Sequence, residues 1–300
     1  MARERQLYEY VMDVALRATL KEHGFKRKTY ASYIRETENR VWIFELTTEP
    51  RIGAGFADTA GVRLPELDRI FGRYGSGRQP HRAGTRNPSL VAASLARLME
   101  IAAGHDYYTK RQGPAAKSWS KEYEAAQSDT IMKYHRAGWW FLDAGLPKPG
   151  EGEDRWERFD RRMDELILKF GQYFNDIWLR YTLPWYKRCD DPLFVADWMV
   201  KYGHAGMAYC TLAVLHHLAD DKTGAAEYLQ RCFEDAAITY DKLYRTLYRQ
   251  YHQSWLESLW RGHKGWADEE IARMAHSRLK QSKQDAETAR TLANGLNIVV

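Results

Sequence analysis

The residues best suited to carry chemistry in this 300-residue chain are arginines gathered in one glycine-rich stretch. The stretch runs from residue 69 to residue 86 and contains no acidic residue. Its arginines are Arg69, Arg73, Arg78, Arg82 and Arg86. A guanidinium group can hold a phosphate through two hydrogen bonds, and each neutralised phosphate adds salt-dependent affinity. Tyr74 and His81 could stack on bases, so the stretch favours a polyanion site.

A second basic cluster, Lys26-Arg27-Lys28, lies nearer the N-terminus. Residues 1–150 hold 24 basic against 17 acidic residues, whereas residues 151–300 hold 21 against 23, so the net charge of +5 comes from the first half. We predict a binding site made of Lys26, Arg27, Lys28, Arg69, Arg73, Tyr74, Arg78, Arg82 and Arg86. The alternative is a solvated loop whose arginines pair with acids elsewhere in the chain.

Motifs for catalysis and metal binding are missing from the sequence. The glycine-rich stretch lacks the Lys-Ser/Thr pair of a phosphate loop, and neither His-Glu-x-x-His nor Gly-x-Ser-x-Gly occurs. His216 and His217 are adjacent, so on a helix they point in different directions. We therefore predict no catalytic residue, no metal and no cofactor. The enzymatic alternative places a site between the N-terminal sheet and the helices, with buried Glu45 or Asp58 as general base.

The three cysteines, Cys189, Cys210 and Cys232, are widely spaced and form no Cys-x-x-Cys pair. They predict no disulfide framework and no zinc site, and reduced thiols fit a cytoplasmic protein. Cys189 follows Lys187 and Arg188, whose charges would lower its pKa and could make it reactive.

Hydrophobic spacing and punctuation outline an N-terminal module. Leu7, Val11, Val14 and Ala18 recur at helical spacing, and Gly24 stands where that helix should stop. The stretches 29–35 and 40–48 are rich in aromatic and β-branched residues and predict a hairpin, and 53–62 supplies a third strand. Six glycines and prolines make 72–88 a loop, and a helix over 89–103 follows. The module is therefore α-β-β-β.

Helices dominate the remainder of the predicted fold. We expect a helix over 156–181 that ends before Pro184, and another that begins at Asp191-Pro192. An Ala-rich hairpin over 207–219 and 224–240 resembles one tetratricopeptide unit, with Ala213 and Ala225 as its small packing residues. Tyrosines 240, 244, 248 and 251 with Trp255 form a helical stripe, and a final helix spans 268–293.

The predicted fold class is α+β, with an α+β module over 1–110, a partly helical connection over 111–155 and a helical region over 156–300. The longest apolar stretch, 205–219, is shorter than the roughly 20 residues that span a bilayer, so we expect no membrane segment.

Two short motifs resemble a known family. A leading helix followed by Gly24-Phe25-Lys26-Arg27-Lys28 and aromatic strands is similar to the start of the bacterial domain-of-unknown-function family 4304. The later Leu183-Pro184-Trp185-Tyr186-Lys187-Arg188 and the Ala-rich helix pair are similar to the rest of its pattern. The resemblance leaves out 104–155 and the last forty residues, 261–300. It implies a fold and brings no activity, cofactor or catalytic residue.

The surplus of Arg, Tyr and Trp without a reactive constellation predicts a non-enzymatic binding protein. We expect its partner to be a protein. The alternative partner is a nucleic acid, bound through the arginine-rich segment 69–86. The oligomeric state stays open.

Overall fold

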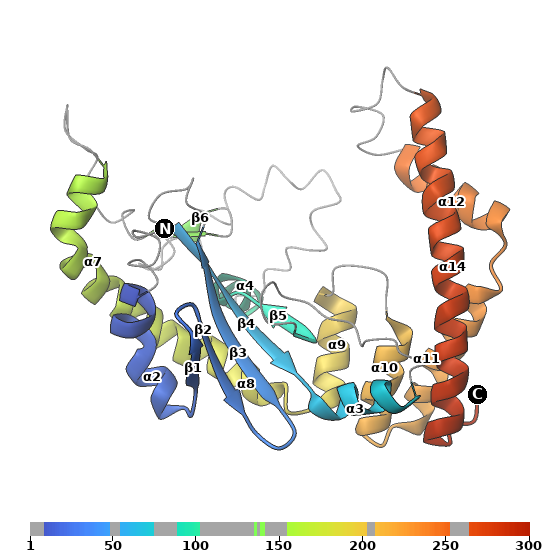
Figure 1. Ribbon diagram of the computed structural model, residues 1–300, viewed down its shortest axis with the longest axis horizontal. Coiled ribbons are helices and arrows are strands. Elements are labelled where there is room, and N and C mark those ends of the chain that lie inside the picture. The colour runs from blue at the N-terminus through green and yellow to red at the C-terminus, as the bar shows by residue number, and fades with distance from the viewer. Residues whose placement is uncertain are drawn as a thin grey trace. The chain divides into compact units, whose positions relative to one another are not determined.

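The computed structural model describes residues 9–48, 55–74, 89–102, 135–136, 139–141, 155–202, 208–252 and 264–300. These residues form a mostly antiparallel sheet built largely from the N-terminal part and a mostly helical C-terminal half (Figure 1), so the predicted α+β class is confirmed. The chain divides into two compact units. We call residues 1–65 and 82–194 the sheet unit, and residues 66–81 and 195–300 the helical unit.

The N-terminal helix has two parts, the π-helical segment η1 (Glu9–Leu16) and α2 (Arg17–Glu22). It ends as predicted at Gly24, whose φ of 79° is readily accessible only to glycine. The N–H of Gly24 donates to the carbonyl of Lys21, and that of Phe25 donates to the carbonyl of Leu20. This pair of bonds is a Schellman cap, which satisfies two orphan carbonyls and turns the chain into the sheet.

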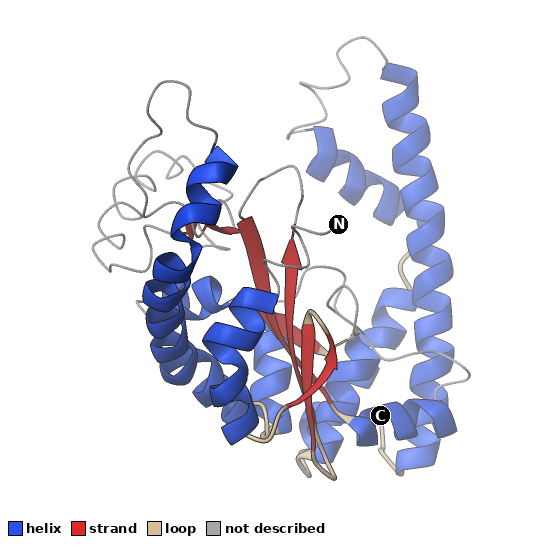
Figure 2. Cartoon of the chain, turned by 60° about the vertical axis from the view of Figure 1, so that its left-hand side comes forward, coloured by secondary structure: helices blue, strands red, loops and turns tan. Residues whose placement is uncertain are grey.

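Four antiparallel strands follow in chain order: β1 (Lys26–Thr29), β2 (Ser32–Glu36), β3 (Val41–Thr48) and β4 (Gly55–Arg63). The hairpin and the third predicted strand are therefore confirmed as β2, β3 and β4. The sequence interpretation missed β1, because three consecutive cations are poor strand formers and carry no alternating pattern. They are accommodated because β1 lies at an edge of the sheet, whose strands are red in Figure 2. Charged side chains on an edge strand can stay in water.

Three shorter strands complete the sheet. β5 (Val91–Ala93) and β7 (Trp139–Phe141) both pair with β4, and β6 (His135–Arg136) pairs with β7. The helix predicted over 89–103 is therefore wrong in its first part. Only α4 (Leu95–Ala102) is helical, because Val91 to Ala93 find a ladder partner along β4.

Register determines which side chains share a face of the sheet. Leu46 lies opposite Asp58, and Glu45 lies opposite Thr59. Because side chains alternate along a strand, one face carries aromatic and aliphatic residues that are buried. These are Tyr33, Trp42, Phe44, Leu46, Phe56 and Val62.

The aromatic face is covered by one nearly continuous run of helix, α7 (Arg155–Ile177), the π-helical η6 (Trp178–Thr182) and α8 (Leu183–Arg188). Phe170 and Phe174 make edge contacts with Phe56 at 5.6 and 5.9 Å between ring centroids. Tyr186 stacks on Trp42 at 5.0 Å and donates a 2.5 Å hydrogen bond to the carbonyl of Ile43.

The expected stop before Pro184 is wrong, because the helix continues through this proline. Proline lacks an N–H, and its ring clashes with the preceding turn of a regular α-helix. The wider turn of η6 immediately before Pro184 provides the local rearrangement that lets α8 follow. α7 belongs to the sheet unit. The domain boundary that the sequence places at residue 155 stays a prediction.

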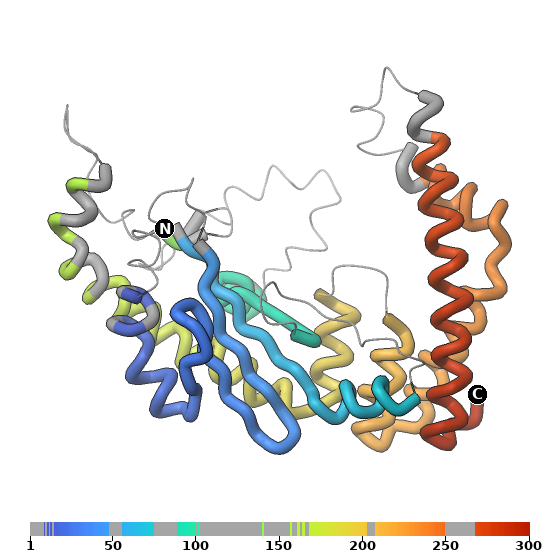
Figure 3. Tube along the Cα trace, viewed as in Figure 1, coloured from blue at the N-terminus to red at the C-terminus, as the bar shows by residue number. Residues whose placement is uncertain are grey.

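The helical unit contains α3 (Pro65–Tyr74), whose first residue lies in the sheet unit, and most of α9 (Pro192–Tyr202). Its other helices are α10 (Tyr209–Leu218), α11 (Lys222–Ala236), α12 (Tyr240–His252) and α14 (Lys264–Leu296). Figure 3 traces α12 and α14 side by side. The predicted start of α9 is confirmed, since the carboxylate of Asp191 accepts a bond from the N–H of Leu193 at 2.9 Å.

The Ala-rich hairpin is present as α10 and α11, and both Ala213 and Ala225 are buried. The tyrosine stripe packs within the chain. Tyr240, Tyr244 and Tyr248 of α12 stack on one another and surround a small core of Leu247, Ile271 and Ala275 between α12 and α14. Trp255 lies outside the described residues. Among the helices that the structure describes, none has the length and apolar character to cross a membrane.

Candidate binding surface

A group of cations is presented where α2 turns into β1. We call the five residues Arg17, Lys21, Lys26, Arg27 and Lys28 the basic edge. All five are exposed. They lie close together because the Gly24 turn joins the last turn of α2 directly to the outermost strand.

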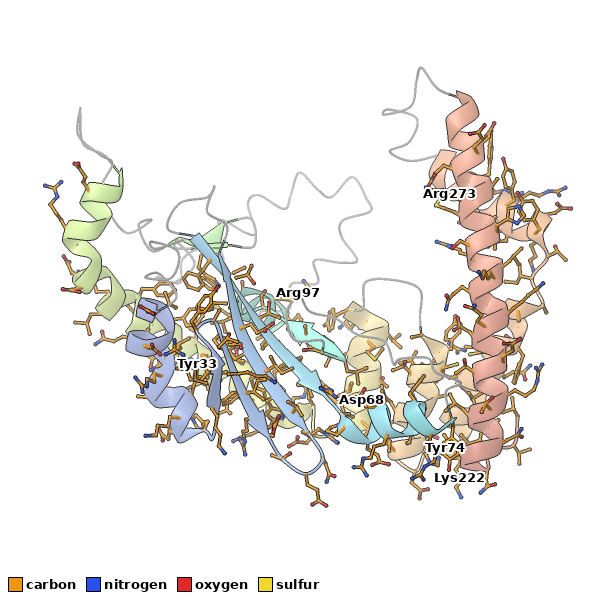
Figure 4. The ribbon with its side chains drawn as sticks, viewed as in Figure 1. Tyr33, Asp68, Tyr74, Arg97, Lys222 and Arg273 are labelled. Carbon is orange, nitrogen blue, oxygen red and sulfur yellow. The ribbon has the colours of Figure 1, made fainter. Side chains whose placement is uncertain are left out.

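The position of Arg27 in the basic edge is fixed by Asp13 of η1. The carboxylate accepts hydrogen bonds from Arg27 Nη1 at 2.9 Å and from the Tyr33 hydroxyl at 3.0 Å. Tyr33 is buried on the aromatic face of β2 (Figure 4). Burial, followed by the hydrogen bond to Asp13, raises the pKa of Tyr33 to about 12, so the phenol stays protonated and keeps donating. Asp13 thus connects the first helix to two strands.

Lys26 and Arg27 of β1 lie on opposite faces of the strand, and the register with β2 shifts between Arg27 and Thr29, at Lys28. Lys26 is opposite Ile34 and Arg27 is opposite Tyr33, so the side chains project to alternate faces. Within the described part of the chain, neither Lys26 nor Lys28 takes part in an ion pair. β1 pairs only with β2 among the described strands, and all four of its residues are exposed. Its backbone edge away from β2 has no strand partner among the described residues, and the exposed Tyr30 follows β1 directly.

The predicted segment 69–86 begins as a helix. Residues 69–74 belong to α3, so the loop predicted over 72–88 is wrong for residues 72–74, and residues 75–88 lie outside the described part of the chain. Arg69 forms an ion pair with Glu66 at 2.8 Å, one helical turn away. The Arg73 guanidinium lies 5.8 Å from the ring of Tyr74.

Tyr74 itself is half-buried against α14, since a Cβ placed on Gly295 would come within 2.4 Å of its ring. That ring is engaged within the helical unit. Arg78, Arg82 and Arg86, together with His81, lie outside the described residues. The described residues of the two predicted clusters belong to different units, with Lys26, Arg27 and Lys28 in the sheet unit and Arg69, Arg73 and Tyr74 in the helical unit.

Glu45 and Asp58, the two candidate general bases, are each 2% exposed. They project from opposite faces of the sheet, so they cannot act as a pair. The Asp58 carboxylate accepts 2.6 Å hydrogen bonds from Trp140 Nε1 and from the N–H of Leu95, the first residue of α4. Burial raises the pKa of Asp58 to about 6, against the opposing effect of these bonds. Both oxygens are used to join β4, β7 and α4, which is a structural role.

Cys189 is fully buried, which favours a structural cysteine over the alternative of a reactive thiol. Burial raises its pKa well above the ordinary value and Asp190 raises it further, while the adjacent Arg188 only partly opposes this. The prediction of a lowered pKa is wrong because sequence neighbours say nothing about desolvation.

His216 bonds through Nδ1 to Asp221 at 2.7 Å, and Asp221 caps α11. No group of three potential metal ligands occurs among the residues that the structure describes.

Comparison with known proteins returns no relative. No family model matches the chain, and no similar sequence is found among curated proteins or similar fold among solved structures. The resemblance of its short motifs to the bacterial family 4304 stays a prediction.

Proposed function

We propose that this chain is a binding protein that recognises an acidic, extended segment of another protein through the basic edge. The observation that carries the proposal is an exposed edge strand whose first three residues are consecutive cations. An extended peptide that adds to such an edge gains main-chain hydrogen bonds from the strand, while alternate side chains supply specificity.

The geometry of β1 indicates what the added segment should contain. Arg27 projects to one face and Lys26 to the other, so acidic side chains on both faces of a peptide would each meet a cation, and the exposed Lys28 adds a third charge at the irregularity in the strand. Arg17 and Lys21 of α2 enlarge the positive surface. Complementary charge raises the association rate and selects the partner more than it adds raw affinity. Lysines on an exposed edge also hinder self-association, which favours selectivity for acidic strands.

A protein partner is favoured over nucleic acid because Tyr74, the aromatic residue predicted to stack on bases in segment 69–86, is already packed within the chain. Tyr74 packs against Gly295 of α14, and neighbouring Arg69 is paired with Glu66. A single-strand binder needs exposed stacking platforms beside its cations, and Tyr74 does not offer one at the predicted segment. Tyr30 is exposed directly after β1, so the binding test includes single-stranded DNA. Catalysis at Asp58 receives no support either, because both of its oxygens hold structural donors.

The test measures binding of a short labelled peptide in which Glu alternates with Val, by fluorescence anisotropy, beside the same peptide with Gln in place of Glu. We expect the Glu peptide alone to bind, with affinity that falls as salt rises. Lys26→Glu with Lys28→Glu should abolish the binding. The matched control is Lys280→Glu with Lys283→Glu, two exposed lysines of α14, which should bind normally.

Two further probes separate strand addition from simple charge attraction. A Glu-Val peptide with alternate backbone nitrogens methylated keeps its charge but cannot form a ladder, and it should not bind. Equal binding of the methylated peptide would contradict the proposed edge recognition. Tighter binding of single-stranded DNA, lost in the Lys26 and Lys28 double variant, would replace the protein partner with nucleic acid.

A further inference from the structure

Two cysteines that are 22 residues apart in sequence meet inside the helical unit. The Sγ atoms of Cys210 in α10 and Cys232 in α11 lie 3.6 Å apart. The two residues are 7% and 1% exposed. Their spacing in the sequence matches no known motif, so the sequence predicts reduced thiols and no contact between them. The fold brings them together because α10 and α11 are consecutive helices packed against each other.

The turn end of this helical hairpin is already fixed by hydrogen bonds. Asp221 accepts a bond from the N–H of Gly224 at 2.9 Å, and its other oxygen meets His216 Nδ1. Cys210 is near the start of α10 and Cys232 is near the end of α11. The two thiols therefore meet at the end of the hairpin away from the turn, where no covalent chain joins the helices.

We propose that Cys210 and Cys232 are a redox site that forms a reversible disulfide when the protein meets a small-molecule disulfide such as oxidised glutathione. The thiolate of Cys210 attacks one sulfur of glutathione disulfide, forms a mixed disulfide and releases one glutathione thiolate. The thiolate of Cys232 then attacks the Cys210 sulfur and releases the second. The two cysteines are oxidised, glutathione disulfide is reduced, and the two cysteine protons end on two glutathione thiols.

The surroundings of the pair favour Cys210 as the first nucleophile. Cys210 is the more exposed of the two, and its thiol donates to the carbonyl of Asp285 in α14 at 3.4 Å. The hydrogen bond with Cys210, and then burial, raise the pKa of Cys232 well above its ordinary value. The sulfurs must approach to about 2.0 Å, a closer distance than in the reduced state. Oxidation therefore replaces a hydrogen bond between α10 and α14 by a covalent link between α10 and α11.

The experiment treats the folded full-length chain with excess glutathione disulfide and then counts thiols after denaturation. We expect the number of free thiols to fall from three to one, with an intact mass lower by two hydrogen atoms. A non-reducing digest should contain one cross-linked peptide joining Cys210 to Cys232, and dithiothreitol should reverse it. Cys189→Ala is the matched control and should lose both remaining thiols.

Variants and a second measurement keep the proposal falsifiable. Cys210→Ala and Cys232→Ala should each form no intramolecular bond, whether or not one of them folds poorly. The oxidised wild-type chain should keep its helical circular dichroism and unfold at higher urea concentration, because the cross-link restricts the unfolded chain.

Persistence of three thiols in the folded chain would refute the site. So would a link that includes Cys189, a glutathione adduct that never proceeds to a disulfide, or a link that forms only in urea.

Discussion

The carboxylates of Asp58 in the sheet unit and Asp221 in the helical unit are satisfied by donors at very different sequence distances. In the sheet unit, Asp58 receives donors from residues 37 and 82 positions away, and the Tyr186 hydroxyl reaches a carbonyl 143 positions away. In the helical unit, Asp221 serves partners only three and five positions away. Long-range bonds form only when the whole unit has folded, whereas local caps form with their helix. We therefore expect substitutions in the sheet unit to have larger and more cooperative effects.

Truncation of the aromatic layer should break the sheet unit most severely. Phe174 is fully buried and contacts Phe56, Trp140 and Phe170. Phe174→Ala removes these contacts and leaves a cavity, so we expect a loss of about 4 kcal/mol in the free energy of unfolding. Urea denaturation followed by tryptophan fluorescence measures it. Phe174→Leu should recover much of the loss, and an alanine variant as stable as wild type would contradict the proposed core.

Removal of the buried carboxylate should have the next largest effect. Asp58→Ala leaves Trp140 Nε1 and the N–H of Leu95 without their acceptor, at a cost of about 3 kcal/mol. The natural residue also makes stability depend on pH.

The folded-state pKa of Asp58 is raised to about 6, so the folded chain binds more protons than the unfolded chain below that value. Its contribution to stability is greatest below about pH 4, declines as the pH rises towards 6 and is constant above, a total of about 3 kcal/mol. Asp58→Asn should lack this decline. If the free energy of unfolding changed with pH in the same way in wild type and in Asp58→Asn, the raised pKa of Asp58 would be contradicted.

Two glycines, Gly61 of the sheet unit and Gly72 of the helical unit, should respond in opposite ways to substitution by alanine. We expect the first change to lower the free energy of unfolding and the second to raise it. A Cβ added to Gly61 in β4 would lie 2.1 Å from Ser89 Oγ, so Gly61→Ala must displace the segment leading into β5. We expect a loss of about 2 kcal/mol, because overpacking a filled site forces shifts of side chain and backbone. Thermal unfolding by circular dichroism checks it, and a neutral result would mean that the segment around Ser89 yields easily.

The local cap of the helical unit should matter less than any of these changes. Asp221→Ala removes the acceptor for the N–H of Gly224 and the partner of His216, and Asp221→Asn should keep most of the capping. The folded-state pKa of Asp221 is lowered, first by the Gly224 bond and then by His216. Its stabilising effect is therefore present above the unfolded pKa and declines as the pH falls. Amides in the first turns of α11 should exchange their hydrogens faster in Asp221→Ala than in wild type. Faster exchange throughout the sheet unit would contradict the expectation that the effect is confined to this helix.

The smallest effect is expected at Gly72 and should be stabilising. Gly72 lies within α3, and an added Cβ would meet no atom within 4 Å. Gly72→Ala restricts the unfolded chain without strain, so we expect a gain of about 0.7 kcal/mol. A loss measured under the same thermal unfolding conditions as Gly61→Ala would show that this part of α3 tolerates no side chain.

The sequence predicted elements correctly where the signal is local. The Gly24 stop, the Asp191 cap and the alanines of the hairpin depend on neighbours within a few residues, so spacing and side-chain type suffice. The sequence-based prediction of secondary structure was wrong where the position of a segment in the sheet outweighs the intrinsic strand or helix propensity of its residues. The cationic β1 is a strand because it lies at an edge, and Val91 to Ala93 are a strand because β4 offers them a partner.

For the candidate surface, the sequence alone determined which cations are available, and Lys26, Arg27 and Lys28 are indeed exposed. Only the tertiary structure decided what surrounds them. It placed Arg27 beside Asp13 and engaged Tyr74 with α14, and it assigned Arg27 and Tyr74 to different units. It also buried Cys189 and brought Cys210 to Cys232. The physical reason is that charge and helix caps are properties of a residue and its neighbours, whereas burial and pairing depend on chain segments far apart in sequence.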